Sequence, residues 1–265
     1  MTDPQPLHAL NPTQRFSDRA RDYALYRPTY PPAAIDAITR GFESTRATEM
    51  SSSRCLRAAD IGAGTGISSR LLADRGLPVL AIEPNQGMRD SAEPHPLVTW
   101  HDGTAEHTNL DDASVNLIVC AQAFHWFNAD KALAEFHRIL RPQGVLCLLW
   151  NDRDNSDPLT AAYSTAITRA SDNHPAAQDR SACGNVIFHT PLFHAATLKL
   201  FPSEQPLTLE ALIGRALSAS YAPKHGPKHN AMIADLTTAH AKHTNAQGLV
   251  SMKYTTRLYR ATTVL

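Results

Sequence analysis

The stretch AADIGAGTG at residues 58–66 decides the fold of this chain. Its apolar first half predicts a buried strand, and its alternating glycines predict a tight turn into a helix that begins near Ile67. Glycine suits such a turn because the backbone adopts unusual dihedral angles and because a ligand can then approach the main chain closely. A dinucleotide site has the spacing GxGxxG, whereas here the third glycine comes one residue early, at Gly66.

Two acidic residues accompany this turn: Asp60 precedes the glycines, and Glu83 follows the next predicted strand. Asp60 can attract an ammonium group while backbone amides meet a carboxylate, which fits a phosphate-free ligand with an amino-acid moiety. Glu83 can accept both hydroxyl protons of a ribose, or it is simply a surface charge at a strand end. S-adenosyl-L-methionine offers both chemical groups, so we predict it as the cofactor. The predicted binding residues are Asp60, Gly62, Ala63, Gly64, Thr65, Gly66 and Glu83.

Strand and helix patterns alternate along the rest of the chain, which predicts an α/β fold with a parallel sheet. The predicted strands cover residues 55–61, 78–82, 115–121, 145–150, 197–201 and 249–259. The predicted helices cover residues 67–75, 130–140 with Asp130 as N-cap, 159–170, and 208–218 with Thr208 as N-cap. We expect a mobile tail at 1–13, an N-terminal cap or lid at 14–45, a cofactor-binding core at 46–150, and a C-terminal part at 151–265 with substrate-side helices and the last two strands.

Composition narrows the expected partners. The 265 residues are 43% hydrophobic, and 25 Lys and Arg balance 25 Asp and Glu, so we expect no nucleic-acid or membrane partner. The four cysteines lack CxxC spacing, and His240 and His243 have no cysteine nearby, so we predict no metal. The N-terminus lacks a signal pattern, so we expect a cytoplasmic protein. The sequence does not determine the oligomeric state.

Three further motifs extend the pattern: DGTAE at residues 102–106, AQAFHWF at 121–127 and RILRPQG at 138–144. With the glycine turn, they resemble in order and separation the class I S-adenosylmethionine-dependent methyltransferases of the type 11 group. The most similar branch is that of small-molecule enzymes that includes trans-aconitate methyltransferase-like proteins. Tyr23, Arg27, Pro28, Tyr30, Pro31 and the SASY stretch at 218–221 also resemble that branch. Asn116, Gln143 and Thr104 depart from the family pattern, the last of them near the expected adenine site.

The resemblance implies a Rossmann-like, seven-stranded, mostly parallel sheet with helices on both faces and the last strand antiparallel. It places Gln122, His125 and Trp126 beside the sulfonium and makes the backbone around Ala105 and Glu106 the expected adenine contact. Tyr23 and Arg27 could close over the cofactor, or they belong to a packed helix with a surface arginine. Tyr30, Arg215 and Tyr221 are candidate substrate-binding residues.

The expected activity is direct in-line methyl transfer from S-adenosyl-L-methionine to a small-molecule acceptor, of which a carboxylic acid is one candidate. Alignment and exclusion of water can supply much of the rate, so a strong general base is optional. His125 is the candidate catalytic residue, because an imidazole can take a proton near neutral pH. It could instead shape the pocket or hydrogen-bond the chain. The alternative for the whole protein is a methyltransferase-fold scaffold that binds the cofactor without turnover.

Overall fold

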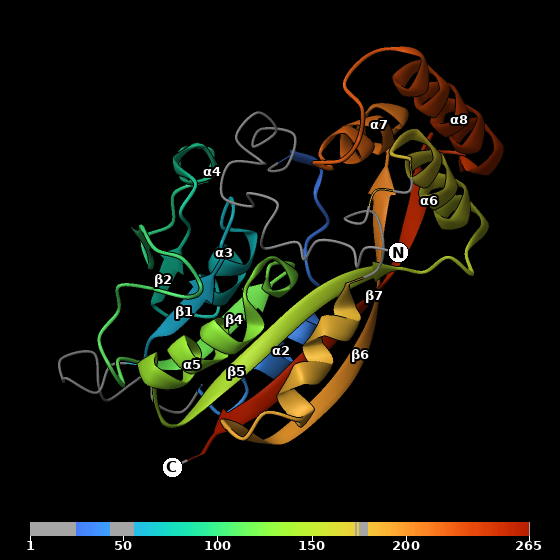
Figure 1. Ribbon diagram of the computed structural model, residues 1–265. Coiled ribbons are helices and arrows are strands. Elements are labelled where there is room, and N and C mark those ends of the chain that lie inside the picture. The colour runs from blue at the N-terminus through green and yellow to red at the C-terminus, as the bar shows by residue number, and fades with distance from the viewer. Residues whose placement is uncertain (1–24, 43–55, 173, 175–179, 265) are drawn as a thin grey trace, which may run out of the picture.

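A seven-stranded sheet organises the computed structural model, which describes residues 25–42, 56–172, 174 and 180–264. The strands lie in the order β3-β2-β1-β4-β5-β7-β6 (Figure 1). Their bounds are β1 Ala58–Ile61, β2 Val79–Ile82, β3 Val98–His101, β4 Val115–Ala121, β5 Leu140–Arg153, β6 Phe193–Leu207 and β7 Val250–Thr263. Strands β1 to β5 pair in parallel, and β7 runs antiparallel to both β5 and β6. The expected mostly parallel sheet with an antiparallel last strand is confirmed.

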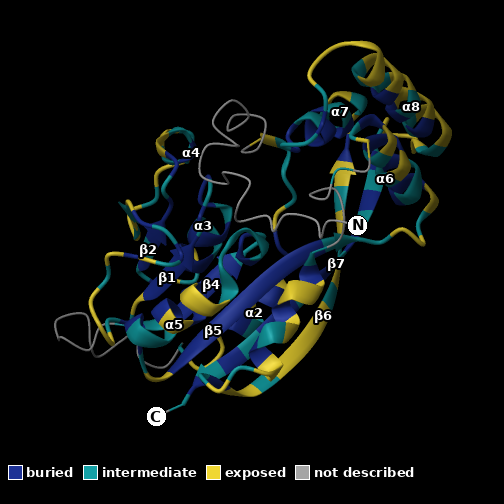
Figure 2. Ribbon diagram, in the orientation of Figure 1, coloured by how far each residue is buried: buried dark blue, intermediate teal, exposed yellow. Residues whose placement is uncertain are grey.

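Helices cover both faces of this sheet. Their bounds are α2 Pro32–Thr39, α3 Ile67–Ala73, α4 Gln86–Asp90, α5 Ala129–Ile139, α6 Pro158–Ala170, α7 Leu209–Leu217 and α8 Pro227–His243, with short 3-10 helices η2 Phe124–Trp126 and η4 Ser181–Phe188. The buried side chains of α2 and α3 pack on one face, and those of α5 and η4 pack on the other. The central strands are therefore buried on both sides, as Figure 2 shows.

Helices α6, α7 and α8 form a second group beyond the carboxyl end of β5 (Figure 1). Their apolar side chains pack together with the first residues of β7 in a core of their own, which includes Tyr163, Leu212, Met232 and Tyr254. Strands β5 and β7 stay paired as far as Arg153 and Tyr254 and so link this group to the main sheet. The predicted boundary between the cofactor-binding core and the C-terminal part, at residue 150, falls inside β5. The predicted domain limits stay a prediction.

Several predicted elements differ in detail from those observed. The N-cap of α5 is Asn128, whose side chain accepts from the backbone N–H of Lys131, so the prediction of Asp130 was wrong. Thr208 caps α7 as predicted, accepting from the N–H of Ala211. Helices α4 and α8 and strand β3 had no counterpart among the predicted elements, and β5, β6 and β7 are longer than predicted. The predicted tail at 1–13, Tyr23 and Cys55 lie outside the described residues.

None of the helices among the described residues is both long and apolar enough to span a membrane. Within that same part of the chain, no group of three His, Cys, Asp or Glu side chains is arranged so that it could hold a metal ion.

Candidate functional site

The glycine turn follows β1 directly, and its backbone has the conformation that glycine favours. Gly62, Gly64 and Gly66 have φ angles of +69°, +58° and +75°, all in the left-handed region. The N–H groups of Gly62 and Ala63 both donate to the carbonyl oxygen of Ile82, at 2.9 and 3.1 Å. The turn is thereby fixed to the end of β2, and α3 begins immediately after it.

Asp60, the last but one residue of β1, lies fully buried beneath the turn. Its Oδ2 accepts from the hydroxyl groups of Ser68 and Ser69, each at 2.6 Å, which ties the first turn of α3 to the strand. Its Oδ1 is buried and has no hydrogen-bond partner among the described residues. Burial raises the pKa of Asp60 to about 6, against the lowering effect of the serine hydroxyls. A cation placed near Oδ1 would favour the ionised form.

Glu83, which follows β2, is buried on the other side of the turn. Its Oε2 accepts from the N–H of Gly64 and its Oε1 from the N–H of Asn85, both at 2.9 Å. Burial raises the pKa of Glu83, and the two backbone hydrogen bonds oppose that rise. The carboxylate thereby supports the glycine turn. Each of its oxygens can accept one further hydrogen bond, so Glu83 could also bind the two hydroxyl groups of a diol.

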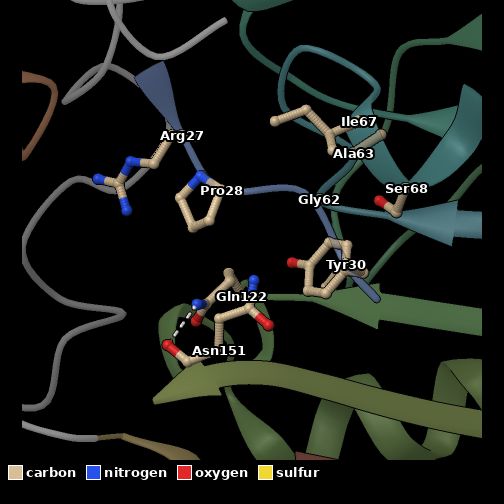
Figure 3. Close-up of a pocket in the computed structure, with 10 residues that line it drawn as sticks. Arg27, Pro28, Tyr30, Gly62, Ala63, Ile67, Ser68, Gln122 and Asn151 are labelled. Atoms are coloured by element: carbon tan, nitrogen blue, oxygen red, sulfur yellow. Dashed lines mark hydrogen bonds between the residues drawn. The ribbon is translucent and has the colours of Figure 1, made fainter. Parts of the chain in front are cut away.

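A pocket opens where the turn meets the carboxyl ends of β4 and β5 (Figure 3). Its lining consists of Arg27, Pro28, Tyr30, Gly62, Ala63, Ile67, Ser68, Ala121, Gln122 and Asn151. Gln122 has a left-handed φ of +56°, and its Nε2 donates to the carbonyl oxygen of Asn151 at 3.2 Å. The side chain of Asn151 donates to the carbonyl oxygen of Thr29 at 3.1 Å and accepts from Thr256 at 2.6 Å. Asn151 therefore joins the N-terminal segment to the sheet at the pocket.

The structure brings together five of the sequence-predicted site residues as pocket lining: Arg27, Tyr30, Gly62, Ala63 and Gln122. Asp60, Gly64, Thr65, Gly66 and Glu83 form or support the adjoining turn. The two residues predicted to contact adenine lie in the loop after β3. Ala105 is buried in the core, and Glu106 accepts from the N–H of Asn128 at 2.7 Å. Arg215 and Tyr221 lie in the C-terminal helical group and do not line this pocket.

The other five lining residues were absent from the sequence-based site: Pro28, Ile67, Ser68, Ala121 and Asn151. Ser68 and Ile67 immediately follow the glycine turn, so the beginning of the helix was itself the signal. Asn151 is the first polar residue after the apolar run VLCLLW at 145–150. A polar side chain at the carboxyl end of a parallel strand marks the edge where ligands bind in open α/β sheets.

His125 lies in η2, directly after β4, and its ring is hydrogen-bonded to the sheet. Its Nδ1 accepts from the indole N–H of Trp150 at 3.2 Å, so the neutral ring carries its proton on Nε2. Burial lowers the pKa of His125 to about 3, and the charges of Arg180 and Arg27 lower it further. The ring of Trp126 lies 5.3 Å from that of His125, centroid to centroid. A neutral imidazole in this arrangement offers an N–H donor at Nε2.

The central segment of the chain is similar to domains of known proteins. Residues 59–148, which contain the glycine turn, Glu83 and His125, match the model of the methyltransferase domain family. Over these residues the chain is similar to methyltransferase domains. An uncharacterized methyltransferase of Mycobacterium tuberculosis is 39% identical to it over 142 residues, and one of Schizosaccharomyces pombe is 34% identical over 156 residues. These alignments cover 52% and 58% of this chain, and the chain spans about half the length of these curated relatives, 53% and 59%.

Solved structures of methyltransferases share the fold of this domain and its additions. A candidate type II methyltransferase from Anaeromyxobacter dehalogenans superposes with a TM-score of 0.60 at 22% identity, covering 90% of this chain and 98% of that one. Phosphoethanolamine N-methyltransferase 2 of Haemonchus contortus, solved with S-adenosylhomocysteine, has a TM-score of 0.53 at 16% identity and coverages of 97% and 59%. The class I, Rossmann-like methyltransferase fold is confirmed. The narrower trans-aconitate-like branch stays a prediction.

The raised pKa of Asp60 predicts a specific pH dependence of stability. Between pH 3.8 and about 6, Asp60 is ionised in the unfolded chain and protonated in the folded one, so stability falls as pH rises through this window. The shift corresponds to a loss of about 3 kcal/mol. Asp60→Asn keeps an oxygen acceptor for Ser68 and Ser69 but cannot ionise. The free energies of unfolding of the two proteins are measured with urea from pH 4 to 7. We expect the stability of the variant relative to the parent to increase as pH rises. If the two free energies changed with pH in parallel, the raised pKa of Asp60 would be wrong.

Proposed function

We propose that this protein transfers a methyl group from S-adenosyl-L-methionine to a small-molecule acceptor. The observation that carries the proposal is the glycine turn of the methyltransferase domain, which is flanked by two buried carboxylates, Asp60 and Glu83, beside one pocket. Cofactor use, the acceptor class and the individual site residues are all part of the proposal.

The residues present fit this cofactor chemically. Asp60 has a buried oxygen without a hydrogen-bond partner in the described chain, and an ammonium group is a suitable partner for it. Glu83 retains two acceptor positions for ribose hydroxyl groups. Thr65 has a buried hydroxyl oxygen that also lacks a partner among the described residues. Gly62 and Ala63 line the pocket, and neither has a side chain larger than a methyl group, so a ligand can approach the backbone of the turn closely.

The reaction requires the acceptor atom to align with the methyl group and requires water to be excluded. When bound, S-adenosyl-L-methionine supplies an electrophilic methyl group on a cationic sulfur. Gln122 and Asn151 fix the floor of the pocket through their mutual hydrogen bond, and Tyr30, which is 6% exposed, closes its side. Arg27 anchors the N-terminal segment to the end of α7 by donating to the carbonyl oxygen of Ser218 at 3.3 Å. These residues orient the reactants, which can account for much of the rate.

Turnover with a panel of acceptors tests the proposal. The full chain is incubated with methyl-labelled S-adenosyl-L-methionine and small carboxylic acids, phenols and amines, and labelled products are separated and counted. We expect transfer to at least one class, with a small acid as one candidate. Saturable cofactor binding without product from any class would favour the alternative, a scaffold that keeps the fold and the cofactor but lacks turnover.

His125 is expected to position reactants through its Nε2 proton and to have no role as the base. Because its pKa is about 3, it stays neutral across the working range, and the pH profile of kcat should show no limb near pH 6.5 from this residue. His125→Asn can retain an acceptor for the Trp150 indole, so we expect kcat within about tenfold of the parent and unchanged cofactor affinity. A general base would lose roughly 100-fold or more on the same substitution, with a change in the pH profile.

A further inference from the structure

The C-terminal helical group contains a buried arginine, Arg215, on α7, and the proposed cofactor pocket does not use it. Only 8% of Arg215 is exposed, and in the part of the chain that the structure describes it forms no ion pair with a carboxylate. Its Nε is buried and has no hydrogen-bond acceptor among those residues. A buried guanidinium without a counter-charge is unfavourable, because the charge has left water without gaining a partner.

Tyrosines surround this guanidinium. Arg215 is hydrogen-bonded to Tyr254, whose hydroxyl in turn donates to Oε1 of Gln205 at 3.2 Å. Burial opposes the charge of Arg215, whereas its hydrogen bond to Tyr254 favours the charge, and the pKa of Arg215 stays above its ordinary value, so it remains a cation. The guanidinium of Arg153 lies 5.7 Å from the centre of the Tyr163 ring. We call Arg153, Tyr163, Arg215, Tyr221 and Tyr254 the Arg215 cluster.

Tyr163 provides a second unused polar atom in the Arg215 cluster. Its side chain is fully buried on α6, and its hydroxyl has no hydrogen-bond partner among the described residues. Burial raises the pKa of Tyr163 to about 12, so the hydroxyl remains protonated and can donate. The cluster therefore holds two buried donors, Arg215 Nε and Tyr163 Oη, together with a net positive charge. An oxyanion complements both features, whereas a water molecule would satisfy the donors and leave the charge uncompensated.

Two short connections place the Arg215 cluster beside the cofactor pocket. Arg153 lies two residues beyond the pocket residue Asn151 in β5 and pairs with Tyr254 of β7. On the other side, pocket residue Arg27 donates to the carbonyl oxygen of Ser218, and the Ser218 hydroxyl donates to the carbonyl oxygen of Arg215 at 2.8 Å. One elongated molecule could therefore occupy both places.

We propose that Arg215 and Tyr163 form a subsite for an anionic group, a carboxylate or a phosphate, on the methyl acceptor. The anion would accept from Arg215 Nε and Tyr163 Oη, while the atom to be methylated faces the pocket at Gln122. The acceptor would then be a molecule with an anionic anchor distinct from the methylated atom. This assignment rests on the proposed function for the identity of the ligand, but the anion site itself can be measured without turnover.

Titration of inorganic phosphate and of succinate into the full chain, with S-adenosylhomocysteine at saturation, tests the subsite by calorimetry and thermal unfolding. We expect at least one anion to bind and to raise the unfolding midpoint. A response to phosphate alone identifies a phosphorylated acceptor, and a response to succinate alone identifies a carboxylic acid. Tyr163→Phe should weaken this binding about tenfold or more, the effect of one hydrogen bond to a charged group, and should leave the midpoint without anion unchanged.

Arg215→Met should abolish the anion response while leaving the midpoint without anion unchanged or higher, because the substitution removes an uncompensated buried charge. Arg169→Gln is the matched control, because Arg169 is an exposed arginine of α6 that pairs with Asp235. It should leave anion affinity unchanged. The proposal is overturned if neither anion binds, if binding survives in both cluster variants, or if Arg215→Met lowers the midpoint while Tyr163→Phe binds normally. Titration of S-adenosylhomocysteine alone reports separately on the proposed cofactor site.

Discussion

Replacement of Glu83 by alanine is expected to lower the affinity for S-adenosylhomocysteine by about 100-fold or more. In the proposed complex, the carboxylate accepts two ribose hydroxyl groups while it holds the N–H groups of Gly64 and Asn85. A hydrogen bond to a charged group contributes about 1.5–3 kcal/mol, so the loss of two such bonds corresponds to at least this factor. Loss of the Gly64 contact would also loosen the glycine turn, which adds to the effect.

Isothermal titration of the parent and Glu83→Ala with S-adenosylhomocysteine measures this prediction, with thermal unfolding as the check that the variant is folded. Glu204→Ala is a suitable control, because Glu204 is an exposed carboxylate of β6 that binds Ser251 and Lys253, far from the turn in the sheet order. Its affinity should equal that of the parent. A folded Glu83→Ala protein with unchanged affinity would remove Glu83 from the site and leave the ribose without an assigned partner.

The glycine turn was predictable from sequence because its determinants are local. A buried strand, three glycines at alternate positions and an immediate helix occupy consecutive residues, and the observed left-handed φ angles follow from that pattern. Glu83 was predictable for a related reason, since it stands at the end of the adjacent parallel strand. The carboxyl ends of neighbouring parallel strands lie on the same edge of a sheet.

The N-cap of α5 shows where local rules become ambiguous. Asn128 and Asp130 are both favourable N-cap residues, so propensity does not distinguish them. In the structure, the backbone N–H of Asn128 is bound by Glu106, a residue of the preceding loop, which fixes the helix start at Ala129. That contact is tertiary, because Glu106 and Asn128 are brought together only when the loop after β3 packs beside the start of α5.

In the C-terminal helical group, α6 and α7 were predicted close to their observed bounds, but α8 was not, because its buried stripe is narrow. Helix α8 buries only Met232, Leu236 and Ala239, with polar or exposed residues on most of its remaining surface. The Arg215 cluster collects side chains from β5, α6, α7 and β7, and no segment of the sequence contains more than a small part of it. The sequence named Arg215 as a substrate candidate, and its burial without a carboxylate partner became visible only with the fold.

Gly62→Ala is expected to destabilise the protein by roughly 2–5 kcal/mol and to weaken cofactor binding severely. Two costs combine at this position. The φ of +69° costs an L-residue about 1–2 kcal/mol, and a Cβ would lie 2.8 Å from Ala123 Cβ and 2.9 Å from Phe127 Cζ. Because such contacts force neighbouring atoms to shift, overpacking adds about 1–3 kcal/mol. The shift would move η2, which carries His125, away from the turn.

Gly248→Ala separates these two costs. Gly248 has a similar φ of +75°, but a Cβ added there would have no atom within 4 Å, so only the backbone cost applies. Urea unfolding should therefore give a loss of about 1–2 kcal/mol for Gly248→Ala with cofactor affinity unchanged. The excess loss in Gly62→Ala then measures the clash between the turn and the segment after β4. If the two variants lost equal stability and both bound S-adenosylhomocysteine normally, the close packing of Gly62 against Ala123 would have no part in shaping the pocket.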